Sequence, residues 1–239
     1  MPELAEVEYY RKQWHPAISH CITGIYLNAS KRVFRGLDPE ALRRGLLGET
    51  FIGSATHGKQ MCFRFGTKHW LGIHLGMTGK THILAPSERP QKHDHLVLQM
   101  SSGVSLAFRD PRMFGRILYS YTNSKPSWWA MLPPEILSTD FTLEYLSRFL
   151  DRRSRSPIKA VLLMQQTFPG LGNWMADEIL WRSRIHPKIM AGNLSTYKRK
   201  KLYRRILEVS RDALKVIGSD WSTPPDNWLF NHRLSLIHI

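Results

Sequence analysis

The sequence predicts an α+β fold, in which an N-terminal helix and an antiparallel β-sandwich domain precede a helical domain. Two observations predict it. Residues 22–121 hold short apolar segments separated by glycine-containing turns, with no long helical pattern between them, which favours an antiparallel sandwich or barrel. From residue 141 onward, apolar residues recur three and four positions apart, as helices require. The predicted domains are therefore residues 1–121 and 141–231.

The first domain begins with a helix over residues 2–14, because a proline near the start and glutamates in the first turn favour helix initiation. Strands of about five residues follow. They are predicted at Ile22–Leu27, Met61–Phe65, Trp70–His74, Leu96–Met100, Val104–Phe108 and Arg116–Tyr121. Residues 101–103, Ser-Ser-Gly, are short enough to join the fourth and fifth of these strands as a hairpin.

Residues 122–140 are rich in Asn, Ser, Lys and Pro, which indicates a linker. Beyond it, helices are predicted at Thr142–Leu150, Pro157–Gln166, Asn173–Ser183 and Ser195–Ile217. Glycines 170, 172, 192 and 218 are expected at helix ends. Residues 232–239 form an apolar tail.

The composition is that of a basic folded protein. The 239 residues include 34 Lys and Arg and 19 Asp and Glu, which gives a net charge of +15. Residues 1–140 carry 17 basic and 11 acidic side chains and residues 141–239 carry 17 and 8, so both halves favour a polyanionic partner. Nucleic acid is the first expectation, an anionic membrane surface the second, and a solvated basic surface remains the alternative.

Several protein classes are excluded by what the chain lacks. No apolar run approaches the roughly 18 residues that a bilayer span needs, so no membrane association through a helix is expected. The acidic N-terminus is not a secretory signal, which predicts a cytoplasmic protein. Only two cysteines, Cys21 and Cys62, are present, too few for a disulfide framework or a four-cysteine metal site. No metal or other cofactor is therefore predicted for this chain.

The N-terminus is the first candidate site. Removal of Met1 would leave Pro2 with a secondary amine, and α-amines have a pKa of about 8, so a fraction is uncharged and nucleophilic near neutral pH. Attack on an aldehyde-level carbon would give an iminium, an electron sink for elimination. Glu3 and Glu6 stand on one helix face and can supply proton transfer. A plain helix start is the simpler interpretation.

Two loops form the second candidate site. Residues 108–115, Phe-Arg-Asp-Pro-Arg-Met-Phe-Gly, are interpreted as a hairpin turn that presents a guanidinium beside an aromatic ring, which suits insertion into a base stack. Residues 74–79, His-Leu-Gly-Met-Thr-Gly, offer a flexible apolar wedge. Core packing is the alternative for Met77 and Phe114. His93 and His95 are expected to be hydrogen-bonded structural residues rather than metal ligands.

The third candidate site is the glycine-rich turn at residues 168–173, which opens into a helix. Exposed N–H groups and the positive end of the helix dipole at such a turn bind phosphate. Asn173 is predicted either to cap this helix or to turn its amide onto a phosphate oxygen. The basic run at residues 198–201 lies on a later helix and is interpreted either as a solvated face or as a phosphate-steering surface.

In order along the chain, these segments resemble the formamidopyrimidine-DNA glycosylase (Fpg/Nei) family of base-excision repair enzymes. The matching segments are MPELAEVE at 1–8, GK at 58–59, HLGMTG at 74–79, KHDH at 92–95, DPRMFG at 110–115 and GLGNWMADEIL at 170–180. The resemblance implies a β-sandwich domain, a helix–two-turn–helix domain and a groove that holds double-stranded DNA containing a damaged base. It also implies a monomer.

The resemblance assigns roles to individual residues. Pro2 is similar to the Schiff-base nucleophile that attacks C1′ of the damaged nucleotide. Glu3 is similar to the acid that assists sugar opening, and Glu6 supports it. Further residues match the family by position: Lys59, His74 and Asn173 as phosphate ligands, Met77, Arg112 and Phe114 as the side chains that fill the gap left by the flipped nucleotide, and Glu178 as a glutamate facing the site.

The implied reaction is excision of oxidised purines, formamidopyrimidine and 8-oxoguanine, followed by β- and δ-elimination that nicks the strand. The alternatives are excision of oxidised pyrimidines, as in the Nei branch, and a lesion-binding protein with little turnover. The chain departs from the family at its end, because family members usually finish with a four-cysteine zinc finger and residues 232–239 contain no cysteine. We therefore expect truncation or an altered reading frame at that point.

Overall fold

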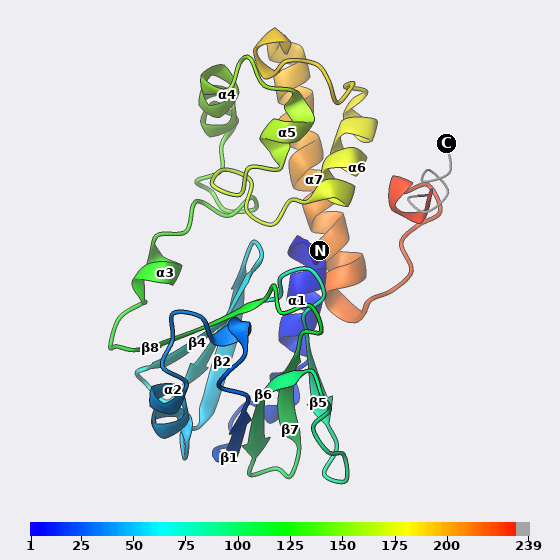
Figure 1. The fold of residues 1–239 in the computed structure, drawn as a ribbon. Coiled ribbons are helices and arrows are strands. Elements are labelled where there is room, and N and C mark those ends of the chain that lie inside the picture. Colours follow the sequence, from blue (N-terminus) through cyan, green and yellow to red (C-terminus); the bar gives the residue numbers. More distant parts are fainter. Residues whose placement is uncertain (233–239) are drawn as a thin grey trace. The chain divides into compact units, whose positions relative to one another are not determined.

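The computed structural model describes residues 1–232, and it divides the chain into two compact units. The first, here called the β unit, holds Met1–Pro2 and Val7–Met131, and the second, the helical unit, holds Glu3–Glu6 and the chain from Leu132 onward. The boundary near the N-terminus falls inside helix α1 (Leu4–Lys12), so the first turn of this helix packs in the helical unit. Figure 1 shows the elements of each unit.

Two four-stranded antiparallel sheets make up the β unit, as the fold class predicts. One sheet has the order β1-β6-β7-β5 and the other the order β2-β3-β4-β8. The strands are β1 (Ile22–Leu27), β2 (Phe51–His57), β3 (Gln60–Phe65), β4 (His69–His74), β5 (Lys80–Leu84), β6 (Asp94–Met100), β7 (Ser105–Arg109) and β8 (Arg116–Tyr121). Short helical segments accompany them: η1 (His15–Ala17), η2 (Arg32–Phe34), α2 (Pro39–Leu46) and α3 (Ser127–Ala130).

Side chains of both sheets share one buried cluster, which makes the β unit a sandwich. Phe63 and Leu71 enter the cluster from one sheet, and Leu98 and Phe108 enter it from the other. Trp14, which follows α1, packs against Phe63 with 4.5 Å between ring centroids and the ring planes tilted by 43°. Burial of large apolar side chains from both faces is what holds two packed sheets together.

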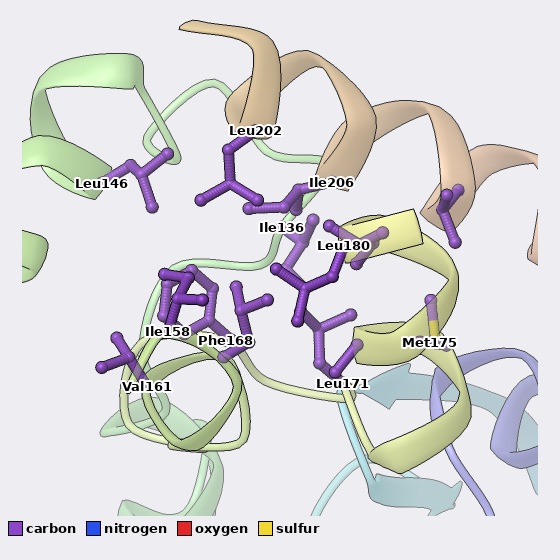
Figure 2. Close-up of a cluster of buried hydrophobic side chains, with 14 of the residues drawn as sticks. Ile136, Leu146, Ile158, Val161, Phe168, Leu171, Met175, Leu180, Leu202 and Ile206 are labelled. Atoms are coloured by element: carbon purple, nitrogen blue, oxygen red, sulfur yellow. The ribbon is translucent and has the colours of Figure 1, made fainter. Parts of the chain in front are cut away.

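The helical unit contains four main helices: α4 (Leu143–Arg152), α5 (Ile158–Leu162), α6 (Asn173–Ser183) and α7 (Thr196–Asp220), with the short turns η3 (Ala191–Asn193) and η4 (Leu229–His232). Thr142 and Ser195 cap α4 and α7 by accepting backbone N–H groups, as helix starts require. Figure 2 shows side chains from several helices and loops, among them Leu146, Phe168 and Leu202, pointing into one buried cluster. Among residues 1–232 no helix combines the length and the apolarity that crossing a membrane requires.

The sequence predicted most elements, but it did not predict all of their ends correctly. Strands β1 and β8 and helix α6 have the predicted bounds. The hairpin of β6 and β7 is confirmed. Gly218 was wrongly expected at a helix end, because α7 continues through it to Asp220. The residue that ends α7 in the left-handed conformation is Trp221, whose φ is 59°.

Truncation of Phe168 tests the packing of the helical unit. This ring is fully buried and meets Phe141 and Phe149 edge-on. Phe168→Ala is expected to lower the free energy of unfolding by about 3–5 kcal/mol in denaturant titration, because it leaves a cavity. Tyr197→Ala, an equal truncation at a side chain that is 69% exposed, should change it by less than about 0.5 kcal/mol. Equal losses in the two variants would contradict the described core.

Candidate functional site

The carboxylate of Glu3 occupies the N-terminus of helix α6. Its two oxygens accept backbone N–H groups from Gly172 (2.8 Å), Trp174 (3.1 Å) and Met175 (3.1 Å). The side chain is almost completely buried. Free N–H groups and the positive end of the helix dipole stabilise a negative charge at this position. The anion site that the sequence predicted for a phosphate is therefore filled, at these three N–H groups, by the protein's own carboxylate.

Glu6 fixes the first turn of α1 around Glu3. Its Oε2 accepts the backbone N–H of Glu3 at 2.7 Å and the indole N–H of Trp174 at 3.3 Å. A side chain three positions into a helix that accepts the N–H of the capping residue is half of a capping box. The N–H of Leu4 also donates to the carbonyl of Gly170 at 3.0 Å. Glu6 thus positions Glu3.

Pro2 immediately precedes this anchored turn. It is half-buried, and its nitrogen is bonded to Met1 in the described chain. Met1 itself is 56% exposed. The secondary amine predicted from the sequence therefore requires removal of a residue that is accessible to solvent.

The glycine-rich turn before α6 is held by a side chain that the sequence did not single out. Gln165 donates to the carbonyls of Leu163 and Leu171 and accepts the N–H of Gly170, whose φ is +94°. Gly172 caps the helix, so Asn173 is not the cap but the first helical residue, with an exposed side chain. A Cβ at Gly172 would lie 2.2 Å from the Glu3 carboxyl carbon. Only glycine therefore leaves room for Glu3 here.

In the β unit, Lys59 and His74 lie close together. Lys59 follows Gly58 in the tight turn between β2 and β3, and the register of β3 and β4 pairs the next residue, Gln60, with His74. Burial lowers the pKa of His74 below its ordinary value, and the positive charges of Lys59 and Arg35 lower it further. The neutral ring accepts the N–H of Gly76 at Nδ1, 3.0 Å away. Lys59 is buried, and His74 is partly buried.

Two of the loops that connect the sheets of the β unit carry candidate residues. Residues 75–79 lead from β4 to β5, and residues 110–115 lead from β7 to β8, so each loop passes from one sheet to the other. The expectation that the second loop closes a hairpin was wrong, because β7 pairs with β5 and β6 whereas β8 pairs with β4. An Asp-Pro turn is compatible with either connection, and local sequence does not distinguish them.

A buried carboxylate braces both loops. Asp110 accepts the hydroxyl of Thr78 at 2.9 Å and the N–H groups of Arg112 at 3.3 Å and Gly115 at 2.7 Å. Its carbonyl accepts Nε2–H of His95 at 2.9 Å, which confirms the structural interpretation of that histidine. This bracing role of Asp110 was not predicted, although an aspartate before proline is a turn signal.

The braced loops present three candidate side chains to solvent. Met77 is 44% exposed and Phe114 is 42% exposed, which contradicts core packing for both. The guanidinium of Arg112 lies over the Phe114 ring, 4.9 Å from its centroid. An apolar pair beside a cation matches the chemistry of side chains that enter a base stack and face phosphates.

Glu178 has a different environment from the other candidates. It is fully buried, and its Oε1 accepts Nε–H of Arg182 at 2.8 Å. Arg182 also binds Glu208 and Asp212 on α7. Glu178 Oε2 has no hydrogen-bond partner among the described residues. Glu178 therefore pairs with Arg182 inside the helical unit.

The zinc finger implied by the resemblance does not fit the described residues. Cys21 and Cys62 are free thiols in the β unit, and burial raises the pKa of Cys62 to about 12. Cys21 is half-buried. Residues 1–232 contain no group of three His, Cys, Asp or Glu side chains placed to hold a metal ion. Of the expected tail, residues 233–239 lie outside the described part of the chain.

The close approach of the two loops can be tested at Gly76. Its φ is +64°, and a Cβ there would lie 2.4 Å from the backbone nitrogen of Gly115. Gly48 has a similar φ of +84° with nothing within 4 Å of a Cβ. In both alanine variants the left-handed backbone should lower the free energy of unfolding by about 1–2 kcal/mol. Overpacking in Gly76→Ala should lower the free energy of unfolding by a further ~1–3 kcal/mol, measured by denaturant unfolding. Equal losses would show that the loops do not pack as described.

The neutral state of His74 predicts a pH dependence of stability. In the unfolded chain this histidine protonates near pH 6.5, whereas its folded pKa is lower. The unfolded state therefore binds more protons in this window, and the free energy of unfolding falls as pH drops below about 6.5. His74→Asn should flatten that part of the stability profile, and His186→Asn, at an exposed site, should not. Identical profiles for wild type and His74→Asn would refute the buried neutral ring.

The chain was compared with known proteins. Residues 1–117 match the model of the formamidopyrimidine-DNA glycosylase N-terminal domain, and residues 132–224 match the H2TH domain of the same enzymes. A formamidopyrimidine-DNA glycosylase of Legionella pneumophila (strain Lens) is 35% identical over 92% of this chain and 79% of its own length.

Solved structures agree with these matches. The LlFpg protein, in a complex with a THF-DNA and an inhibitor, superposes with a TM-score of 0.85 at 27% identity and covers 97% of this chain and 86% of its own. MutM in complex with DNA that contains carbocyclic 8-oxo-G superposes with a TM-score of 0.83 at 30% identity, over 93% and 83%. Sequence and fold thus agree across both units, and the chain belongs to the formamidopyrimidine-DNA glycosylase family.

Proposed function

We propose that this protein is a bifunctional DNA glycosylase and AP lyase that excises oxidised purines from double-stranded DNA through the amine of Pro2. The observation that carries the proposal is the fixed carboxylate of Glu3, held by three backbone N–H groups next to that residue. A proton-transfer group adjacent to an amine nucleophile is what Schiff-base chemistry on a sugar requires. The protein acts as a monomer, inside the cell with its DNA.

The first step is proposed at C1′ of the damaged nucleotide. After removal of Met1, the nitrogen of Pro2 uses its lone pair to form a bond to C1′. The glycosidic bond breaks, and the base leaves with the electron pair of that bond and a proton from water. Glu3 takes the proton that the Pro2 nitrogen loses and gives it to the ring oxygen as the sugar ring opens, which leaves an iminium between Pro2 and C1′.

Elimination follows from the iminium. The positively charged nitrogen accepts electron density from C2′ after that carbon loses a proton, and the 3′-phosphate leaves as the β-elimination product. This first elimination nicks the strand on the 3′ side, and a second, δ-elimination expels the 5′-phosphate, so that a one-nucleotide gap remains. Hydrolysis of the remaining imine then regenerates the amine, so no redox co-reactant is needed.

The loop tips and the candidate phosphate ligands have complementary roles in the proposal. Extrusion of a nucleotide costs a few kcal/mol of stacking, and Met77 and Phe114 offset part of that cost by filling the gap. Arg112 faces the orphaned base. Lys59, His74 and Asn173 are proposed to bind phosphates beside the lesion, and the exposed amide of Asn173 supports this.

The preference for purines rests on two observations. HLGMTG together with DPRMFG favours the purine branch over the pyrimidine branch. The MutM structure of similar fold was solved with DNA that contains carbocyclic 8-oxo-G.

Borohydride trapping tests the proposal. The purified protein is incubated with a duplex that contains one 8-oxoguanine, and reduction should convert the iminium into a covalent protein–DNA adduct. Pro2→Gly should lower adduct formation by at least about 100-fold, since it replaces the secondary ring amine by a primary amine on a more flexible residue. Phe114→Ala should lower it by about tenfold, and Tyr121→Ala, at an exposed aromatic outside the loops, should leave it unchanged.

Each contrary outcome has a defined meaning. An adduct that forms at the wild-type level in Pro2→Gly would refute the secondary amine of Pro2 as the nucleophile. Binding without an adduct would identify a lesion-binding protein that does not turn over. A stronger adduct with an oxidised pyrimidine would assign the Nei-type preference, and equal affinity for damaged and undamaged duplex at matched salt would indicate a general polyanion binder.

A further inference from the structure

The helical unit contains an open cavity along α4 that the proposed reaction does not use. Its volume is about 640 Å³, within the range of about 300–1,000 Å³ that small-molecule pockets occupy. Tyr145, Phe149 and Arg152 share one face of α4 because they are four and three positions apart. The full lining is Tyr145, Phe149, Arg152, Arg153, Gln166 and Thr167.

Two guanidinium groups meet at one ring of this cavity. The Cζ atom of Arg152 lies 5.5 Å from the centroid of Phe149, and that of Arg153 lies 5.9 Å from it. Within residues 1–232 neither arginine forms an ion pair, and both are exposed. Two like charges held at the same aromatic ring repel each other, so an anion between them would be favoured.

The carboxylates of α4 do not supply that anion. Glu144 lies 3.9 Å from Arg148, and Asp151 lies 2.7 Å from Arg199 of α7. Both acidic residues of the helix are therefore engaged with arginines outside the cavity. The local charge at the cavity remains that of two cations.

A hydroxyl adds a third polar group. Thr167 lines the cavity, and although the residue as a whole is only 2% exposed, its hydroxyl can donate a hydrogen bond to an acceptor that enters the cavity. Tyr145 offers a partly exposed ring for stacking, and Gln166 offers an amide for hydrogen bonding.

We propose that this cavity binds a nucleoside monophosphate. The phosphate lies between Arg152 and Arg153 and accepts the hydroxyl of Thr167, because guanidinium groups bind phosphate oxygens in pairs. The planar base lies against Tyr145. The same chemistry is offered by a free nucleotide and by the phosphorylated end of a nucleic-acid strand.

Calorimetric titration of the full chain tests the site. The probes are dAMP, inorganic phosphate and deoxyadenosine. dAMP should bind saturably, and deoxyadenosine should bind at least about tenfold more weakly, because it lacks the charged oxygens. The double variant Arg152→Gln/Arg153→Gln should weaken dAMP by about 10- to 100-fold. Thr167→Val should weaken dAMP and inorganic phosphate alike, whereas Tyr145→Ala should weaken dAMP but not inorganic phosphate.

A matched control removes the same charge elsewhere. Arg155→Gln/Arg211→Gln lowers the net charge by two at exposed residues outside the cavity and should leave dAMP affinity unchanged. Failure of dAMP to bind, or equal weakening in the two double variants, would overturn the proposal. Because no measurement uses base excision, its outcome is independent of the glycosylase test.

The source of the ligand is then distinguished with short single strands. A 5′-phosphorylated tetranucleotide and its unphosphorylated counterpart are titrated against wild type and the Arg152→Gln/Arg153→Gln variant. A phosphate-dependent affinity that the variant loses identifies strand ends as ligands of the cavity. If the phosphorylated strand shows no such difference while dAMP does, the cavity binds the free nucleotide.

Discussion

The burial of one negative charge governs the organisation of the candidate active site. Glu3 is almost fully enclosed, and a buried carboxylate without compensation costs several kcal/mol. Three backbone N–H groups at the start of α6 compensate it, and the absence of a side chain at Gly172 makes their approach possible. The first turn of α1 consequently belongs to the helical unit. The position of the residue before it, Pro2, follows from this electrostatic requirement.

The β unit uses the same principle in a second place. Asp110 is buried and accepts two backbone N–H groups and one hydroxyl, which holds two loops that would otherwise be joined only through their strands. In both units a buried carboxylate binds glycine-containing backbone, and candidate functional groups stand next to the anchored segment: Pro2 next to Glu3, and Arg112 and Phe114 next to Asp110. Rigid anchors of this kind lower the entropy that exposed side chains lose when they bind a ligand.

Sequence reasoning located the elements and the chemistry-bearing segments, but it did not find what holds them. Periodicity predicted β1, β8 and α6, since these segments carry clear apolar patterns. β2 was not predicted, because polar and small residues such as Gly53 and Ser54 interrupt its pattern. The contacts of Glu3 with α6 join residues about 170 positions apart, and no local pattern carries such information. Glu178 was assigned by position alone, and its burial with Arg182 emerged only from the fold.

The division of α1 between the two units has a consequence for dissecting the protein. A fragment cut at the junction near Met131 would separate Glu3 from the helix that its carboxylate caps, because Glu3 precedes the β unit in the chain and packs in the other unit. In the isolated C-terminal piece, the three backbone N–H groups at the start of α6 would be open to solvent or to a foreign anion. Neither half is self-contained, so an autonomous C-terminal module would have to be engineered with a grafted acidic cap rather than obtained by truncation.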